Sequence, residues 1–248
     1  MATPPSSSSP QSLTGASVLL AGASGGIGSA LAEELQRRGA VLTLVARREG
    51  PLQDLAVSGK RLGVDLRSPD GCTAAVEAAR AHGDGVLDVV INAVGVVAFG
   101  SVEELSLDAM EELFLTNTFV SIMLAKAALG AMAEGGALVN VSGVIAEQNL
   151  PGMAAYGASK AAVRSFDEAL AREARRRRVR VLDARPPHTE TGLAERPIEG
   201  AAPRMPAGLS PATVARVICD GLESGAAELP STAFDRAPEA ATSGPVTP

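Results

Sequence analysis

Two side chains, four residues apart, could carry acid–base chemistry in this chain. Tyr156 is the single tyrosine among 248 residues, and Lys160 follows it by one helical turn. In a helix, residues at this spacing lie on one face, so the ammonium group can sit near the phenol. A nearby positive charge lowers the phenol pKa, ordinarily about 10, and such a phenol can pass a proton to a substrate oxygen. The same pattern also fits a surface helix that merely carries the two residues.

A glycine-rich turn points to a second kind of chemistry, the binding of phosphate groups. The apolar segment 16–21 predicts a strand, and Gly22, Gly26 and Gly28 follow it at the start of a helical pattern. Glycines let the backbone approach a pyrophosphate, and a helix N-terminus offers free N–H groups. Three glycines alone also fit an ordinary turn. The second strand predicted over 41–46 favours a dinucleotide site.

The end of that second strand bears on the choice of cofactor. An NAD site carries an acidic residue there, whereas this chain has Ala46, followed by Arg47 and Arg48. No carboxylate is present to repel a 2′-phosphate, and guanidinium groups can bind it by charge-assisted hydrogen bonds. The alternative is a pair of solvated arginines that open a loop. The sequence favours NADP.

The rest of the chain alternates between the two periodicities of strands and helices. Further strands are expected over 61–66, 87–91, 137–142, 179–184 and, in a short form, 226–229. Helices are expected over 69–81, 108–132, 156–176 and 211–222. This alternation predicts an α/β fold, a doubly wound parallel sheet of six to seven strands with helices on both faces. Ligands of such sheets bind at the carboxyl ends of the strands, where Asp65, Asn92 and Gly95 fall.

Composition bounds the class of protein. A hydrophobic content of 46% suits one domain over about 14–230, with disordered segments at 1–13 and 231–248. The net charge of −6 argues against nucleic acid as a partner, and we expect no metal site and no apolar run near the ~18 residues of a membrane span. Two isolated cysteines and no secretory pattern predict a reduced, cytoplasmic protein. The Pro- and Gly-rich segment 186–209 is a candidate substrate lid.

With these residues in place, the chain resembles the short-chain dehydrogenase/reductase family. The matching pieces stand in the family's order: the Gly22-x-x-x-Gly26-x-Gly28 turn, Asp65, Asn92-x-x-Gly95, Asn117 and Tyr156-x-x-x-Lys160. The resemblance implies a single-domain Rossmann fold that transfers a hydride between NADP(H) and a carbonyl or alcohol substrate. It also implies a homodimer or homotetramer.

The resemblance assigns roles to individual residues. Tyr156 would be the general acid/base, Lys160 would bind the nicotinamide ribose and lower the tyrosine pKa, and Asn117 would hold a water of the proton relay. The expected cofactor contacts are Gly22, Ser24, Gly26, Ile27, Gly28, Arg47, Arg48, Asp65, Leu66, Asn92, Gly95, Tyr156, Lys160 and Thr189.

Gly143 is the main departure from the family pattern. The family's catalytic serine lies thirteen residues before the tyrosine, and that position is Gly143 here. Ser142 is its neighbour, but adjacent strand residues point to opposite faces. A water, an oxygen of the substrate or a polar loop residue could replace the hydroxyl, with Gln148 and Asn149 nearest in sequence. The alternative function is therefore a dinucleotide-binding sensor or assembly subunit with impaired catalysis.

Overall fold

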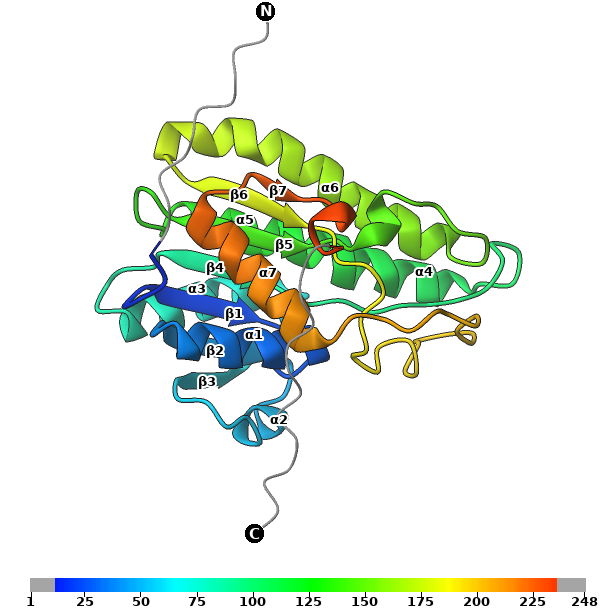
Figure 1. Ribbon diagram of the computed structural model, residues 1–248, viewed down its shortest axis with the longest axis horizontal. Helices are drawn as coiled ribbons and strands as arrows, with labels where there is room; N and C mark the ends of the chain where they lie inside the picture. The colour runs from blue at the N-terminus through cyan, green and yellow to red at the C-terminus, as the bar shows by residue number, and fades with distance from the viewer. Residues whose placement is uncertain (1–11, 236–248) are drawn as a thin grey trace, which may run out of the picture.

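Short apolar strands form the centre of the fold. In the computed structural model, which describes residues 12–235, seven strands form one parallel sheet in the order β3-β2-β1-β4-β5-β6-β7 (Figure 1). They are β1 (Ser17–Ala21), β2 (Val41–Ala46), β3 (Lys60–Gly63), β4 (Val89–Asn92), β5 (Ala137–Val141), β6 (Arg180–Ala184) and β7 (Glu228–Leu229). The central strands β1 and β4 are buried along their whole length. The strand order reverses between them, where doubly wound sheets bind their ligands. The predicted fold class is confirmed.

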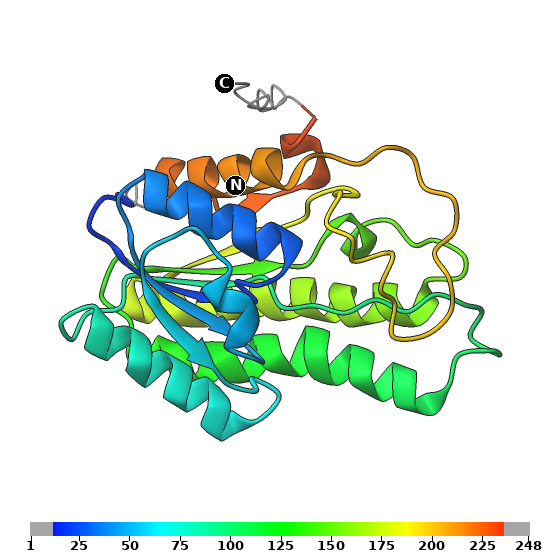
Figure 2. The ribbon, with the colours of Figure 1, turned by 90° about the horizontal axis from the view of Figure 1, so that it is seen from below.

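Helices cover both faces of this sheet and enclose two apolar cores (Figure 2). One face carries α1 (Gly26–Arg37) and α7 (Pro211–Ser224), which pack against each other. The other face carries α3 (Pro69–His82), α5 (Val120–Leu129) and α6 (Ala154–Ala174). Two shorter helices, α2 (Gly50–Gln53) and α4 (Leu107–Leu113), complete the helices; α2 was not predicted from the sequence.

Serine residues fix the start of three helices. Ser68, Ser106 and Ser210 each stand at the N-cap, where the hydroxyl oxygen accepts a hydrogen bond from the backbone N–H three residues later. Such a cap satisfies one of the four unpaired N–H groups of a helix and contributes about 1 kcal/mol. The local sequence therefore sets where α3, α4 and α7 begin.

The two ends of the described chain are part of the core. Leu13, which the expected N-terminal segment 1–13 includes, is fully buried, and so is Phe234 in the expected tail 231–248. Both expected boundaries are wrong by a few residues, because these apolar side chains pack against the layer that α1 and α7 form. Residues 1–11 and 236–248, where the other parts of both segments were predicted, lie outside the described residues.

One continuous helix is more apolar than the sequence suggested. The stretch Leu107–Leu129 is long and apolar enough to cross a membrane by length and composition alone, with a mean hydropathy of 1.3. The expectation that no run approaches a membrane span is therefore wrong by that criterion. Half of this stretch is buried inside the protein, and its α5 portion packs against α3 and α6 as a core helix does. Its middle, Phe114–Phe119, is π-helical.

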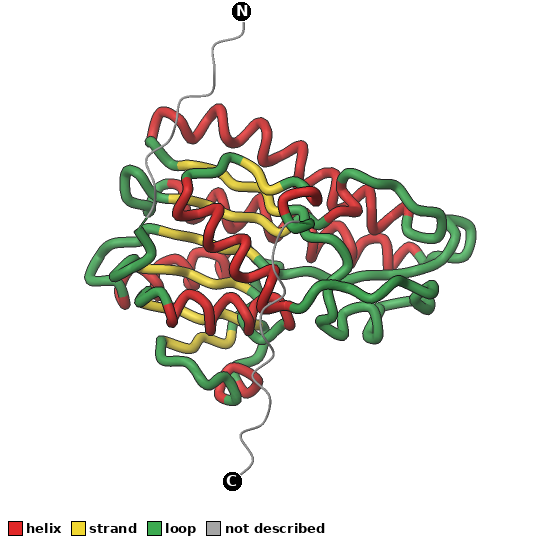
Figure 3. Tube along the Cα trace, in the orientation of Figure 1, coloured by secondary structure: helices red, strands yellow, loops and turns green. Residues whose placement is uncertain are grey.

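Loops gather at the carboxyl edge of the sheet (Figure 3). The predicted lid, residues 186–209, leaves β6 at this edge and contains no helix or named strand. Its two ends meet in a single bridge between Thr189 and Leu209. The lid therefore starts and ends beside the site where a ligand of this fold would lie.

Candidate active site

The glycine-rich turn after β1 has no room for a side chain at three positions. A Cβ atom on Gly22 would lie 2.8 Å from the carbonyl carbon of Ala93, and one on Gly28 would lie 2.0 Å from the carbonyl oxygen of Gly22. On Gly26 it would lie 2.5 Å from the Cβ of Thr191. Gly22 also has a φ of +79°, which side chains disfavour. The turn therefore brings β1, α1 and two loops into contact.

The first turn of α1 has backbone donors to offer a ligand. Its N-cap, Gly25, provides no side-chain cap, and within residues 12–235 the N–H groups of Gly26 and Ile27 donate to no backbone acceptor. All three residues line a cleft, while Ser24 lies exposed on the turn. Free N–H groups at the positive end of a helix dipole bind phosphate groups. The turn fits the pyrophosphate of a dinucleotide on these grounds.

The residues expected to hold the adenosine half lie at the ends of β2 and β3. Arg47 and Arg48 are both exposed directly after β2. Asp65 lies two residues beyond the end of β3, so the expected strand was too long. Its carboxylate accepts a hydrogen bond from Arg67 at 2.7 Å, which holds the Asp65 pKa below its usual value, and Arg67 also contacts Glu112 at 3.1 Å. Arg67 therefore adds a third guanidinium that the sequence reading missed.

A cleft of about 330 Å³ joins the dinucleotide turn to the predicted catalytic pair. It lies beyond the carboxyl ends of β1, β4 and β5, and its lining is mostly apolar. Of the predicted residues, the cleft is lined by Gly26, Ile27, Gly95, Tyr156, Lys160 and Thr189. Gly22 and Gly28 do not line it and are packed against neighbouring backbone, and Leu66 is buried in the core.

Burial dominates the electrostatics of the catalytic pair. Desolvation raises the pKa of Tyr156 to about 12 and lowers the pKa of Lys160 to about 8, against a smaller opposing effect of the Asp183 charge. The ammonium group donates a hydrogen bond to the carbonyl oxygen of Val141 at 2.9 Å. The expectation that Lys160 lowers the phenol pKa is therefore wrong for the protein without cofactor, because the lysine is directed toward β5 and burial disfavours the phenolate.

Asn117 faces the backbone of a loop rather than the cleft. Its side-chain oxygen accepts from the N–H of Val96 at 2.9 Å, and its amide donates to the Val96 carbonyl at 3.0 Å and to Ser159 at 2.9 Å. The Ser159 hydroxyl in turn donates to the carbonyl of Tyr156 at 2.7 Å. Asn117 thereby ties the loop after β4 to the turn of α6 that carries Tyr156. It lies in the π-helical segment, a local distortion that often marks functional sites.

Asn92 is part of a buried polar network behind the cleft. Its amide donates to Ser121 at 2.9 Å and to the side-chain oxygen of Asn140 at 3.1 Å, and Asn140 donates to Asp167 at 2.7 Å. Burial raises the pKa of Asp167 well above its ordinary value. The predicted Asn92 therefore fixes β4, β5, α5 and α6 relative to one another, and its side chain does not line the cleft.

Position 143 has space for a serine side chain, but its backbone conformation disfavours one. Gly143 has φ +89° and ψ 162°, a region that only glycine occupies readily, although the nearest atom to an added Cβ would be 3.9 Å away. The hydroxyl of Ser142 donates its hydrogen bond to Asp183 and so is not available to a substrate oxygen. Gln148 and Asn149 are exposed and do not line the cleft. None of the three neighbouring polar side chains therefore replaces the serine.

Arg185 holds the turn that contains Gly143 in place. This guanidinium is buried and contacts Asp183 at 2.6 Å, Glu228 at 2.6 Å and, more closely, Glu147. Glu147 also accepts a hydrogen bond from Ser231 at 2.7 Å. Arg185 thus links β6, β7 and the turn after β5 in one network.

Most residues that line the cleft were not predicted from the sequence, and four of them have side chains that bear on its chemistry or its closure. Thr191 lies against Gly26 of the dinucleotide turn, two positions after the expected contact Thr189. His188, Arg196 and Met205 reach the cleft from the lid. A lone loop histidine carries no readable signal, and the path of an irregular loop cannot be inferred from periodicity. Within the described residues, no group of three or more His, Cys, Asp or Glu side chains could hold a metal ion.

Comparisons with known proteins place this geometry in a family. The family model for short chain dehydrogenases matches residues 16–200. The chain is 34% identical over 209 residues to a mouse 3-ketodihydrosphingosine reductase. The aligned region covers 79% of this chain and 63% of the relative. The chain thus spans a little under two thirds of that relative. It is 31% identical over 189 residues to the 3-oxoacyl-acyl-carrier-protein reductase FabG of Vibrio cholerae, covering 74% and 77%.

Solved structures agree. An alcohol dehydrogenase from the archaeon Thermococcus sibiricus, complexed with 5-hydroxy-NADP, superposes with a TM-score of 0.75 at 25% identity, over 86% of this chain and 94% of that one. The chain belongs to the short-chain dehydrogenase family of oxidoreductases. The resemblance inferred from the ordered motifs is confirmed, and with it a nicotinamide dinucleotide as the cofactor class.

Proposed function

We propose that the protein is an NADP(H)-dependent reductase or dehydrogenase of a mostly apolar carbonyl or alcohol substrate, with Tyr156 as general acid/base. One observation carries this proposal: the first turn of α1, Tyr156 and Lys160 line a single cleft at the carboxyl edge of the sheet. A bound nicotinamide dinucleotide supplies or accepts the hydride. Tyr156 exchanges the proton with the substrate oxygen, and Lys160, held by Val141, lies one helical turn away to bind the nicotinamide ribose.

The preference for NADP rests on charge at the end of β2. Arg47 and Arg48 are exposed there, and Arg67 neutralises Asp65 nearby. A hydrogen bond to a charged group contributes about 1.5–3 kcal/mol, so one lost contact to the 2′-phosphate weakens binding about ten- to hundredfold. Arg47→Ala should weaken NADPH and leave NADH nearly unchanged, with the exposed Arg172→Ala as matched control. Equal losses for both cofactors would show that Arg47 only supports the fold.

The cleft and the relatives both suggest the kind of substrate. Besides the cofactor turn, the lining is formed by apolar side chains such as Val97, Phe99, Ile145 and Leu193. Two of the relatives carry names that specify ketone groups, 3-ketodihydrosphingosine and 3-oxoacyl-acyl-carrier protein. We therefore favour an apolar ketone with a hydroxyl group near the reacting carbonyl, because that hydroxyl can donate the hydrogen bond that is missing at Gly143.

A second function is favoured by the same site. Gly143 has no hydroxyl, and the hydroxyl of Ser142 donates its hydrogen bond to Asp183. Burial also raises the pKa of Tyr156 to about 12. Each of these features lowers the capacity for proton transfer at neutral pH. The alternative is a sensor or assembly subunit that binds the dinucleotide and turns over slowly or not at all.

One experiment separates the two functions. NADPH oxidation is followed with cyclohexanone, acetophenone, 2-hydroxyacetophenone and ethyl acetoacetate, while NADPH affinity is measured by fluorescence. Turnover that disappears in Tyr156→Phe, with NADPH affinity retained, supports the enzyme. Tight NADPH binding with no turnover on any of the four ketones supports the sensor.

Location and assembly are proposals as well. Cys72 and Cys219 are both buried free thiols, as in a reducing cytoplasm. Phe119 is 53% exposed at the end of the π-helical segment before α5, and Leu107 is 68% exposed at the start of α4. Exposed apolar side chains of this kind suit a contact between copies in a homodimer or homotetramer, which light scattering in solution would test.

A further inference from the structure

The cleft has an unmet requirement for a hydrogen-bond donor. Negative charge develops on the substrate oxygen during hydride transfer, and one donor placed there typically contributes about 10²–10³ in turnover. Gly143 has no side chain and a backbone that disfavours serine. The loss is therefore built into the fold, and in an active protein the donor comes from another side chain of the cleft, from a water or from the substrate.

Most of the polar side chains that line the cleft are already committed. Ser142 donates to Asp183, Lys160 donates to Val141, and Thr189 donates to the carbonyl of Pro187 at 2.8 Å. Arg196 donates to the carbonyls of Gly192 and Thr191, at 3.0 and 3.4 Å, and Thr191 packs against Gly26 in the dinucleotide turn. The Thr191 hydroxyl accepts a hydrogen bond from the N–H of Leu193 at 3.2 Å. Within residues 12–235, Tyr156 and His188 are therefore the polar side chains of the lining for which no hydrogen bond is formed.

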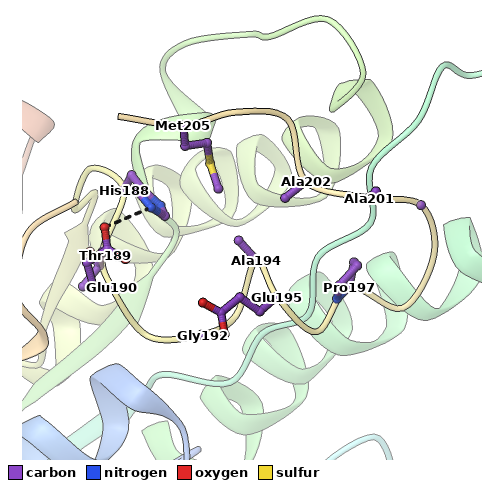
Figure 4. Close-up of a pocket in the computed structure, with 11 residues that line it drawn as sticks. His188, Thr189, Glu190, Gly192, Ala194, Glu195, Pro197, Ala201, Ala202 and Met205 are labelled. Atoms are coloured by element: carbon purple, nitrogen blue, oxygen red, sulfur yellow. Dashed lines mark ion pairs between the residues drawn. The ribbon is translucent and has the colours of Figure 1, made fainter. Parts of the chain in front are cut away.

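His188 follows closely in sequence on the residue that lies nearest the vacant serine position. The nearest atom to a Cβ on Gly143 would be the carbonyl oxygen of Pro186, two residues before His188. The histidine lines the same cleft as Gly143 and Tyr156. It also lines a second cavity of about 430 Å³ under the lid, where its ring lies beside Glu190 and Met205 (Figure 4). His188 is thus positioned between the catalytic cleft and the lid cavity.

The lid holds the imidazole of His188 in this position. The backbone carbonyl of His188 accepts from the N–H of Leu209 at 2.9 Å, and a Cβ on Gly208 would lie only 2.8 Å from the ring carbon Cδ2. Nε2 of the ring lies 3.6 Å from Oε1 of Glu190, which is itself fixed by the N–H of Gly208 at 2.6 Å. The other ring nitrogen, Nδ1, makes no hydrogen bond within the described residues, and it can donate one to a ligand when it carries a proton.

We propose that His188 contacts the substrate and donates the hydrogen bond to the substrate oxygen that a serine at position 143 would otherwise donate. The inference rests on the proposed oxidoreductase function and adds a residue to it. It also makes His188 a specificity-determining residue, because a substrate that reaches from Tyr156 to the lid cavity must pass the imidazole. The substrate class that fits is an apolar ketone that extends toward the lid.

The first test compares His188→Phe and His188→Gln with the wild type, using NADPH and the four ketones above. We expect His188→Phe to lower kcat about a hundredfold with unchanged NADPH affinity. His188→Gln keeps a donor, and its kcat should be at least about tenfold higher than that of His188→Phe. The matched control is His82→Asn, because His82, the one other histidine, is exposed at the end of α3. Unchanged kcat in His188→Phe, or a rise in KM alone, would show that His188 is only part of the wall.

The second test needs no turnover and so separates this inference from the proposed function. In His82→Asn, the imidazole resonances of the protein come from His188 alone and can be followed by NMR. We expect them to shift when a ketone is added to the NADP⁺-loaded protein, beyond any shift that NADP⁺ itself causes. If the wild type is inactive but these resonances shift, the reductase proposal fails and the contact stands. If none of the four ketones moves them, the inference about His188 is wrong.

Discussion

Lys160 should make the protein less stable than it would be with an apolar side chain of the same length. The side chain is 6% exposed, and burial lowers its pKa from 10.5 to about 8. At pH 7 the folded protein therefore contains a desolvated, charged ammonium group. At 1.36 kcal/mol per pKa unit, this lowers the free energy of unfolding by about 3 kcal/mol. Lys160→Met removes this cost together with one hydrogen bond to Val141, which contributes about 1 kcal/mol. We expect the cofactor-free variant to be more stable than the wild type by about 2 kcal/mol at pH 7.

The pH dependence gives this prediction its sign. Between the folded pKa of about 8 and the unfolded value of 10.5, the unfolded chain binds more protons at this group. Stability of the wild type therefore rises with pH across this window, whereas Lys160→Met lacks this contribution. The advantage of the variant should be constant below pH 7, shrink through pH 9, and fall by about 2 kcal/mol by pH 10.

Urea denaturation of both proteins at pH 6, 7, 9 and 10, without cofactor, measures the effect. Lys126→Met is the matched control, because Lys126 is exposed on α5 and should give a difference that does not change with pH. Lys160→Met should also lose most of its NADPH affinity and turnover. A variant that is less stable than the wild type at pH 7, or an advantage that grows with pH, would refute the assignment of Lys160 as a buried, destabilising charge kept for function.

Two glycine substitutions test the backbone of the site. Gly143→Ser should lower the free energy of unfolding by about 1–3 kcal/mol, because the φ of +89° is strained for any side chain. Turnover on cyclohexanone should not rise. A tenfold gain in kcat would show that the turn relaxes to accept serine. Gly26→Ala should weaken NADPH binding at least tenfold, because the methyl group would meet Thr191 at 2.5 Å, and Gly50→Ala, which would meet nothing within 4 Å, is its control. Equal NADPH affinity in the two alanine variants would mean that the turn is not close-packed around the cofactor.

The regular part of the fold could be predicted because its signals are local. The apolar runs predicted every strand of the sheet to within a few residues. The helix predicted over 69–81 matches α3 to within one residue, because Ser68 caps its start. The ends were predicted less well. Leu13 and Phe234 sit in polar, Pro- and Ser-rich surroundings, and only their burial against other elements shows that they belong to the core.

The site was predicted in its residue types but less well in its contacts. The Tyr156–Lys160 spacing correctly placed both side chains in one cleft, but the sequence could not show that Lys160 bonds to Val141, since that depends on the path of β5. The role expected for Asn117, holding a water of the proton relay, stays a prediction, and its side-chain bonds to Val96 and Ser159 could not be inferred from the sequence. His188 was not predicted as a site residue, because the lid has no periodicity from which its course could be inferred.

The two walls of the cleft differ in how firmly they are anchored. Arg185 and its carboxylates hold the wall that follows β5. The lid is pinned near Glu199, which bonds to Phe99 and Ser106, and again at Gly208. Between these points the backbone of residues 201–207 forms no hydrogen bond to the rest of the described chain, and two prolines in it lack an N–H. Segments with few hydrogen bonds open at the lowest free energy. We therefore expect residues 201–207, between Gly200 and Gly208, to open more easily than the wall after β5, and Met205 is the residue of this segment that lines the cleft.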